Sequence, residues 1–222
     1  MTSTSAGLGI LGGTFDPVHR GHLQAALRVR EALGLAEVHL IPAAMPPHRA
    51  KPLASDIDRL AMVQAAVAGI CGLVADGREL ARPGPSYTYD TLRELRAEFP
   101  ARPLYLIVGA DAFRGFDTWH RWRELVDFAH VVVVDRPGAG PPTVSATLST
   151  WLRQRPAMKM KRDAPAGGVH FLSLPPVDIS ASDIRERLAR GAPVGDLLPA
   201  AVLAYIHSHH LYQRRADGNA KT

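Results

Sequence analysis

The chain has almost no cysteine: one residue, Cys71, among 222. A single cysteine cannot close a disulfide within the chain, which argues against a disulfide-stabilised secreted domain and favours the reducing cytoplasm. The sequence also lacks an apolar run of the roughly 18 residues that a membrane-spanning helix requires. Its first residues, MTSTSAG, contain no basic segment followed by an apolar one, so no secretory signal is expected. We therefore expect a cytoplasmic protein with no membrane partner.

Aromatic residues are scarce at 6%, whereas 46% hydrophobic and 21% charged residues are typical of an ordinary globular protein. The formal net charge is +5 and the isoelectric point is near 9.7. This basic balance suits nucleotides and nucleic acids alike, so charge does not choose between them. Aromatic and basic residues do not alternate in a stripe, and we therefore expect no nucleic-acid partner.

Short apolar segments alternate with amphipathic ones along the chain. We expect strands at residues 8–11, 37–42, 72–75, 104–108 and 131–134, and helices at residues 20–33, 55–69, 89–99, 182–190 and 199–209. This alternation predicts an α/β fold in which a doubly wound parallel sheet carries the C-terminal helices packed on it. We expect one domain over residues 1–212 and a polar tail over 213–222, while residues 137–168 receive no assignment.

Ligands of such sheets bind at the carboxyl ends of the strands, where the loops 12–19, 43–52 and 109–120 are expected to meet. The first of these loops belongs to the stretch GILGGTFDPVHRGHL, which joins a strand, a glycine turn and the start of a helix. Free backbone N–H groups and the helix dipole make such a junction an anion site. His19 and His22, three residues apart on one helix face, can both point at the same phosphate.

Two other nucleotide motifs do not fit this stretch. Gly7, Gly9 and Gly12 spell GxGxxG, but this dinucleotide motif belongs after a strand and here runs through one. The phosphate-loop pattern GxxxxGK[ST] does not occur. The remaining alternative is that the two histidines lie on a helix face that binds no ligand.

Two further clusters are given plainer interpretations. His207, His209 and His210 suggest a metal site, but they lie near a helix end without a second ligand group, and we expect no protein-bound metal. Residues 159–162 (KMKR) resemble a loop of aminoacyl-tRNA synthetases, but we expect no anticodon domain in 222 residues and interpret the segment as a solvated or phosphate-facing loop.

Seven segments follow one another in a fixed order: GGTFDPVHRGH at 12–22, PPHR at 46–49, PSYTYDTL at 85–92, VGAD at 108–111, TWHRW at 118–122, RPG at 136–138 and ISASDIR at 179–185. Together they resemble the nucleotidyltransferase superfamily and, within it, the bacterial nicotinate-nucleotide adenylyltransferases. The resemblance covers about residues 7–212 and implies a Rossmann-like fold. It also implies transfer of the adenylyl group of ATP to nicotinate mononucleotide, giving deamido-NAD and pyrophosphate, with Mg²⁺ bound to ATP.

The resemblance implies two adjoining binding sites. The residues implied to bind ATP are Gly12, Gly13, Thr14, Phe15, His19, His22, Gly109, Asp111, Ile179, Ser180 and Arg185. The residues implied to bind nicotinate mononucleotide are Thr14, His48, Ser86, Tyr87, Thr88, Trp119, His120 and Arg136. His19, His22 and Arg185 are implied to be catalytic.

The resemblance also implies how the acceptor is held. Trp119 stacks on the nicotinate ring, and backbone N–H groups near Thr88 and His120 receive its carboxylate. Taken without the family, Trp119 is a core residue, ISASDIR is a helix cap and Asp111 caps the next helix.

The chain departs from the family at three places. Ala43 and Ala44 replace a stretch that often carries asparagine, His120 replaces a tyrosine, and Ser182 replaces a threonine. The first two bear on the acceptor site. An adenylyltransferase for another acceptor, such as nicotinamide mononucleotide or phosphopantetheine, remains an alternative, as does a nucleotide-binding module without turnover. The oligomeric state stays open, and a homo-oligomer is among the states that the sequence allows.

Overall fold

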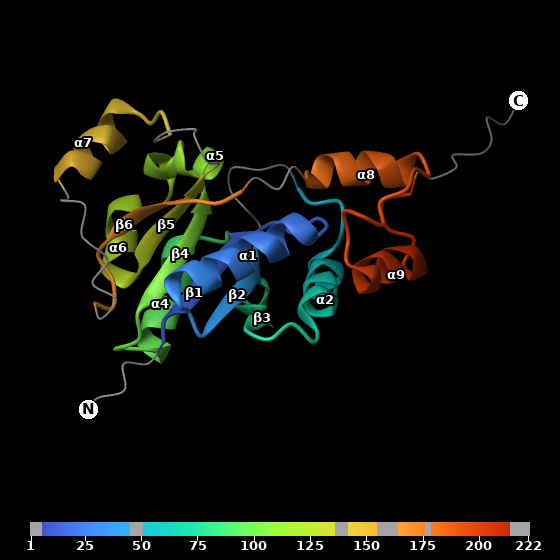
Figure 1. The fold of residues 1–222 in the computed structure, drawn as a ribbon, viewed down its shortest axis with the longest axis horizontal. Helices are drawn as coiled ribbons and strands as arrows, with labels where there is room; N and C mark the ends of the chain where they lie inside the picture. Colours follow the sequence, from blue (N-terminus) through green and yellow to red (C-terminus); the bar gives the residue numbers. More distant parts are fainter. Residues whose placement is uncertain (1–5, 45–50, 136–141, 155–163, 176–178, 214–222) are drawn as a thin grey trace, which may run out of the picture.

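The structure is a computed structural model that describes residues 6–44, 51–135, 142–154, 164–175 and 179–213 (Figure 1). At its centre lies a parallel sheet with the strand order β3-β2-β1-β4-β5-β6. The strands are β1 (Leu8–Gly13), β2 (Glu37–Pro42), β3 (Leu73–Ala75), β4 (Leu104–Gly109), β5 (His130–Asp135) and β6 (Val169–Ser173). The order runs outward from β1 in both directions, which is the Rossmann-like doubly wound topology. The predicted fold class is therefore confirmed.

Helices cover both faces of this sheet (Figure 1). They are α1 (Arg20–Leu33), α2 (Asp56–Val67), α3 (Arg78–Ala81), α4 (Thr88–Glu98), α5 (Ala110–Phe113), α6 (Leu125–Phe128), α7 (Ala146–Gln154), α8 (Ala181–Ala189) and α9 (Ala200–Ser208), with short 3₁₀ turns at Phe116–Thr118 and Trp122–Glu124. Apolar side chains of α1, α2, α8 and α9 share one buried cluster, and those of α4 to α7 share the other. The C-terminal helices thus join the cluster on the α1 and α2 side, and α9 packs against α2 rather than directly on the sheet (Figure 1).

Strand β4 shows why the central strands are continuous apolar runs. Leu104, Leu106 and Val108 belong to the cluster on the α4 side, whereas Tyr105 and Ile107 belong to the cluster on the α1 side. Side chains alternate between the faces of a strand, and a sheet covered on both faces therefore needs apolar residues at every position.

Two helix boundaries follow from ordinary capping chemistry. The hydroxyl of Ser55 accepts a hydrogen bond from the backbone N–H of Asp58, which begins α2 as the sequence predicted. Helix α1 ends at Gly34, which adopts a left-handed φ of 63°. These caps fix the residue at which α2 begins and the residue at which α1 ends.

Strand β6 and helix α7 were not predicted. Residues Val169–Ser173 form an edge strand whose side chains are half-buried or exposed, so the segment carries no continuous apolar run. Helices α3, α5 and α6 span four residues each, too few for a 3.6-residue period to be read.

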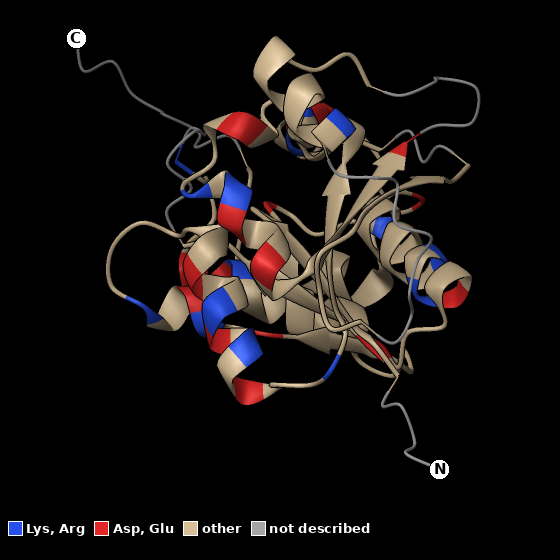
Figure 2. Cartoon of the chain, turned by 90° about the vertical axis from the view of Figure 1, so that its left-hand side faces the viewer, with Lys and Arg blue, Asp and Glu red and all other residues tan. Residues whose placement is uncertain are grey.

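Charged residues lie mostly on the helices, with acidic and basic positions interspersed, while the strands are mainly uncharged (Figure 2). Among the residues that the structure describes, no helix is both long enough and apolar enough to cross a bilayer.

Candidate active site

The glycine turn leaves the carboxyl end of β1 and leads into α1. A methyl group placed on Gly12 or Gly109, at the ends of the adjacent strands β1 and β4, would meet no atom within 4 Å. No described protein atom fills the space over either glycine, so a ligand can approach the backbone there closely. Phe15 adopts a positive φ of 50° and buries its ring against His22, with 4.9 Å between ring centroids.

A buried carboxylate holds this turn in place. The side chain of Asp16 accepts hydrogen bonds from the backbone N–H groups of Leu53, at 2.8 Å, and Ala54, at 3.1 Å. It also accepts one from the hydroxyl of Tyr212, at 2.7 Å. The carbonyl of Asp16 accepts one from Nη1 of Arg185, also at 2.7 Å. The turn is thus tied to α2, α8 and the chain beyond α9.

Arg59 supports the turn from the other side. Its guanidinium is fully buried, donates to the carbonyl of Thr14 at 2.7 Å and pairs with Asp56 at 2.6 Å. Sequence reasoning found neither Arg59 nor Tyr212. Both act through contacts distant in sequence, and no local motif indicates them.

The two histidines lie against each other at the start of α1. Their rings stack with centroids 3.7 Å apart. The backbone N–H of His19 donates to Nδ1 of His22 at 3.3 Å. Because Nδ1 of His22 accepts, the neutral ring carries its proton on Nε2, which is the tautomer that can donate to a phosphate.

Burial sets the electrostatics of the inner histidine. His19 is 6% exposed, its Nδ1 has no hydrogen-bond partner among the described residues, and burial lowers its pKa to about 4. Burial therefore holds His19 neutral. A phosphate bound alongside would raise this pKa again, because an adjacent anion favours the charged form of an imidazole.

A wide groove of about 1170 Å³ runs over the turn and along α1. All but one of the residues implied to bind ATP line it: Gly12, Gly13, Thr14, Phe15, His19, His22, Gly109, Asp111, Ile179 and Arg185. The exception is Ser180, which occupies the N-cap position of α8 while its neighbours Ala181 and Ser182 line the groove.

Two of the capping interpretations can be checked directly. The side chain of Ser180 makes no capping hydrogen bond to α8. Asp111 lies inside α5, whose N-cap is Gly109, and its largely exposed carboxylate pairs with Arg114 at 2.9 Å. Neither side chain caps a helix, so the capping interpretations were wrong.

A smaller cavity of about 240 Å³ lies on the other side of the glycine turn. Every described residue that was implied to bind the mononucleotide lines it, namely Thr14, Ser86, Tyr87, Thr88, Trp119 and His120. Two others, His48 and Arg136, lie outside the described residues, as does the KMKR segment. The cavity and the groove share six residues, which are Gly12, Gly13, Thr14, Ile107, Ala112 and Trp119. Two ligands can therefore meet over the turn.

Trp119 is partly buried and contributes both to the core and to the site. Its ring packs on Phe116, with 5.2 Å between centroids, and still lines both hollows. His120 is exposed and stacks on Tyr87 at 4.4 Å. Thr88 is the first residue of α4, and first-turn N–H groups have no carbonyl partner within their own helix. The aromatic rings of Trp119, Tyr87 and His120 thus line the same cavity as the start of α4, where the backbone N–H groups have no partner within the helix.

The alanines that replace the family's asparagine still contribute through their backbone. The N–H of Ala44 donates to the hydroxyl of Ser86 at 2.9 Å, which joins the end of β2 to the segment before α4. Glu79, which sequence reasoning missed, also lines the small cavity. It lies between β3 and α4 in no recognisable motif, and only the sheet topology brings it to this edge.

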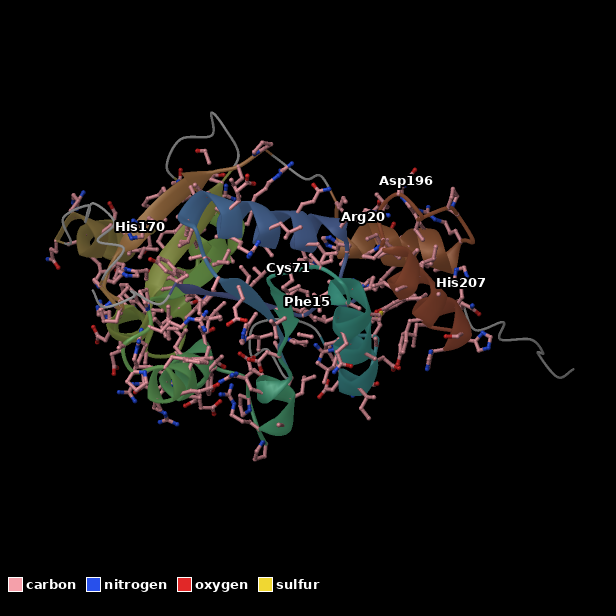
Figure 3. All side chains as sticks on the ribbon, turned by 60° about the horizontal axis from the view of Figure 1, so that its bottom comes forward. Phe15, Arg20, Cys71, His170, Asp196 and His207 are labelled. Atoms are coloured by element: carbon pink, nitrogen blue, oxygen red, sulfur yellow. The ribbon has the colours of Figure 1, made fainter. Side chains whose placement is uncertain are left out.

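The C-terminal histidines and the cysteine lie away from these hollows. In Figure 3, His207 and His170 are at opposite ends of the molecule and Cys71 is on the surface. Within the described part of the chain, no group of three or more histidine, cysteine, aspartate or glutamate side chains is placed to hold a metal ion.

The chain is similar to known proteins over most of its length. Residues 10–187 match the family model described as cytidylyltransferase-like. A protein of Pseudomonas fluorescens named "Probable nicotinate-nucleotide adenylyltransferase" is 48% identical over 207 residues, which cover 93% of this chain and 97% of that protein. A protein of the same name from Pseudomonas syringae pv. tomato is 47% identical, covering 99% and 100% of the two chains.

Solved structures share the fold. The Plasmodium falciparum nicotinic acid mononucleotide adenylyltransferase complexed with NaAD superposes with a TM-score of 0.70 and covers 93% of this chain and 97% of its own. Sequence identity in that comparison is 17%, so it bears on the fold alone.

Proposed function

This chain belongs to the nicotinate-nucleotide adenylyltransferases of the cytidylyltransferase-like family, and on that premise we propose that it transfers the adenylyl group of ATP to nicotinate mononucleotide. The products are deamido-NAD and pyrophosphate. One observation carries the proposal: a nucleotide-sized groove and a small aromatic-walled cavity meet over the Gly12–Thr14 turn, beside two stacked histidines.

The reaction needs no nucleophile from the protein. A phosphate oxygen of the mononucleotide attacks the α-phosphorus of ATP, the new P–O bond forms, and the bond to the bridging oxygen breaks to release pyrophosphate. Catalysis then consists of positioning and of stabilising the charge that develops on the phosphates. Groups that donate hydrogen bonds over the turn supply that stabilisation.

His22 donates from Nε2 to the phosphates, and the start of α1 adds backbone donors and its dipole. Arg185 uses two of its N–H donors on Asp16 and Ser182. A guanidinium has five such donors, so others remain for phosphate oxygens. Gly109 and Asp111 lie where the ribose of ATP extends along the groove, and Ile179 lies toward the base.

Mg²⁺ enters with ATP as part of the substrate. Among the residues that the structure describes, the acidic ones lining the groove are Asp16, Asp111 and Asp135, and Asp16 is already bonded to two backbone N–H groups and a tyrosine hydroxyl. These three carboxylates do not form a ligand set, and we expect the metal to rely on phosphate oxygens.

The acceptor occupies the small cavity. Trp119 stacks on its pyridine ring, and the N–H groups of Thr88 and His120 donate to the ring carboxylate. Of the other acceptors, nicotinamide mononucleotide has an amide in that place and phosphopantetheine has no aromatic ring for Trp119.

The test is to incubate purified protein with Mg²⁺-ATP and each of the three acceptors in turn, measuring pyrophosphate and the mass of the product. We expect pyrophosphate and deamido-NAD with nicotinate mononucleotide. Product with phosphopantetheine alone, or nucleotide binding without any product, would overturn the proposal.

A further inference from the structure

The small cavity contains a buried carboxylate to which the proposed function gives no task. Glu79, in the short helix α3, is 8% exposed and lines the cavity beside Ser86, Tyr87 and Thr88. An unpaired carboxylate there would repel an acceptor that itself carries a carboxylate. The contacts of Glu79 show why it does not act as an unpaired charge.

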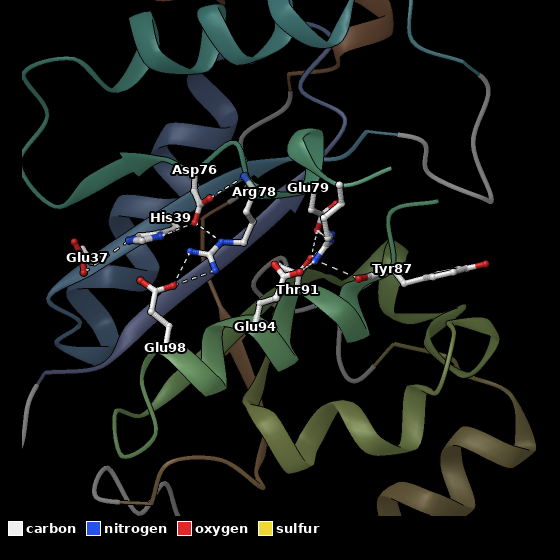
Figure 4. Close-up of polar contacts among 10 residues, drawn as sticks. Glu37, His39, Asp76, Arg78, Glu79, Tyr87, Thr91, Glu94 and Glu98 are labelled. Carbon is white, nitrogen blue, oxygen red and sulfur yellow. Dashed lines mark hydrogen bonds and ion pairs between the residues drawn. The ribbon is translucent and has the colours of Figure 1, made fainter. Parts of the chain in front are cut away.

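One hydroxyl group donates directly to Glu79 (Figure 4). The hydroxyl of Thr91 lies 2.6 Å from Oε1, and Nη2 of Arg82 donates to the same hydroxyl at 2.6 Å. Because Arg82 supplies a proton to Thr91, the hydroxyl proton of Thr91 is directed at Glu79. Ser86 lines the same cavity, its hydroxyl oxygen accepts from the N–H of Ala44, and it acts to lower the pKa of Glu79.

The charge of Glu79 is balanced locally. Nη2 of Arg82 lies 4.0 Å from its carboxylate, and Nη1 of Arg82 pairs with Glu94 at 2.9 Å. Burial raises the pKa of Glu79, while the hydroxyl groups of Thr91 and Ser86 act in the opposite direction. The carboxylate is therefore compensated within the protein, by the Thr91 hydroxyl and by the charge of Arg82.

Helix α3, which carries Glu79, is itself fixed. Nε of Arg78 pairs with Asp76 at 2.7 Å and its Nη2 pairs with Glu98 on α4 at 3.2 Å (Figure 4). Asp76 accepts from the backbone N–H of Arg78 at 3.0 Å and donates its own N–H to the carbonyl of Leu40 in β2 at 3.0 Å. Glu79 thus projects from a helix anchored to the sheet and to α4.

Ser86 and Thr91 lie on either side of Thr88, the residue at which α4 begins. The carboxylate holds Thr91 directly, and Ser86, on the other side of Thr88, is held by the N–H of Ala44. We propose that Glu79 is a positioning residue for acceptor recognition: through its bond to Thr91, with Ser86 lining the same cavity, it fixes the direction of the Thr88 N–H. This inference rests on the proposed function and adds a specificity determinant to it.

Replacing Glu79 by glutamine separates this role from general stability. An amide offers one acceptor oxygen and a donating NH₂ and carries no charge, so it neither pairs with Arg82 nor presents two acceptor oxygens beside Thr91 as a carboxylate does. We expect Glu79→Gln to raise KM for nicotinate mononucleotide by about tenfold, because the hold on Thr91 weakens and the donors at Thr88 lose their fixed direction. KM for ATP is expected to stay within about twofold, because the ATP groove does not contact Glu79.

Glu186→Gln is the matched control. Glu186 is also a helical glutamate that pairs with an arginine, Arg190, but its side chain is 71% exposed and it lines neither the cavity nor the groove. Hydrogen exchange of the segment 86–92, measured by mass spectrometry, gives a readout that does not depend on turnover. The segment is expected to exchange faster in Glu79→Gln and at the wild-type rate in Glu186→Gln.

Thr91→Val keeps the test decisive if Glu79→Gln fails to fold. It removes the hydroxyl that donates to Glu79 and is expected to show the same selective rise in KM, and the double variant should lose less than the product of the two single losses. A wild-type protein without activity toward nicotinate mononucleotide refutes the proposed function, while the exchange data still test the positioning role. Folded variants with unchanged KM and unchanged exchange, or equal rises in KM for both substrates, would overturn the inference.

Discussion

His22 and His19 differ in environment although they stack on each other. His22 lines the groove and has its Nδ1 occupied by the N–H of His19. His19 is buried, with its pKa lowered to about 4. Burial thus favours a neutral His19, and any charge on this ring has to come with the bound phosphates.

At this scale we expect His22→Ala to fold normally and to lose turnover by roughly 10²–10³, the typical cost of removing one charge-stabilising donor. His19→Ala should behave similarly. The double variant should lose less than the product of the two single losses, since both rings act on one phosphate group. Steady-state kinetics with circular dichroism as the folding control decides this. Wild-type turnover in a folded His22→Ala protein would remove the histidine from the mechanism.

Trp119 permits a second prediction at the residue scale. Its ring lines both hollows, and stacking recognises a ring rather than the substituent on it. Trp119→Ala should raise KM for nicotinate and nicotinamide mononucleotides alike and leave the ratio of their kcat/KM values within a few-fold. A variant that changes the ratio by more than tenfold would mean that Trp119 recognises the substituent.

At the scale of elements, the sheet and its main helices could be predicted from the sequence, because buried parallel strands and amphipathic helices leave periodic patterns. Strand β6 could not, since a half-exposed edge strand has no such pattern. In the site, the glycine turn and the histidines belong to a local motif. Arg59, Glu79 and Tyr212 do not, since each is brought to the site by chain connections that only the fold establishes.

The link between the C-terminal segment and the turn can be tested with Tyr212→Phe. This change keeps the ring and removes the hydroxyl that donates to Asp16 at 2.7 Å. We expect a loss of about 1–3 kcal/mol in the free energy of unfolding, because a buried carboxylate loses one donor. Urea denaturation measures it, with Tyr205→Phe as the control, since that hydroxyl donates to the more exposed Asp58 at 3.0 Å. Equal stability of Tyr212→Phe and the wild type would show that the tether contributes nothing.

At the scale of the whole molecule, stability should depend on buried neutral histidines. Burial lowers the pKa of His19, His130 and His170. His130 accepts from the N–H of Gly168 at 3.0 Å, and its other ring nitrogen lies 2.8 Å from the carbonyl of Ala164, an arrangement that the neutral ring satisfies. Below about pH 6.5 the unfolded chain binds protons that the folded protein refuses.

Their contribution to the free energy of unfolding is therefore complete above about pH 6.5 and is lost as the pH falls toward the lower folded-state pKa values. We expect the melting temperature to fall between pH 7 and pH 5. His130→Gln, which removes one titrating group, should melt lower at pH 7 and show a shallower fall. A melting temperature that rises as the pH falls from 7 to 5 would contradict the assignment of neutral buried rings.

The central claim, that the small cavity selects an acceptor carrying a carboxylate, is tested most directly by kcat/KM for nicotinate and nicotinamide mononucleotides on the wild-type protein. A pocket of backbone N–H groups offers donors only; a carboxylate accepts with both oxygens, whereas an amide must turn its NH₂ toward a donor and leave it unpaired. The unpaired donor costs about 1–3 kcal/mol, and more where the lost partner is charged. The account predicts a preference for the acid of at least ~10²-fold, as hydrogen-bonding pockets achieve. Equal values for the two mononucleotides would contradict it.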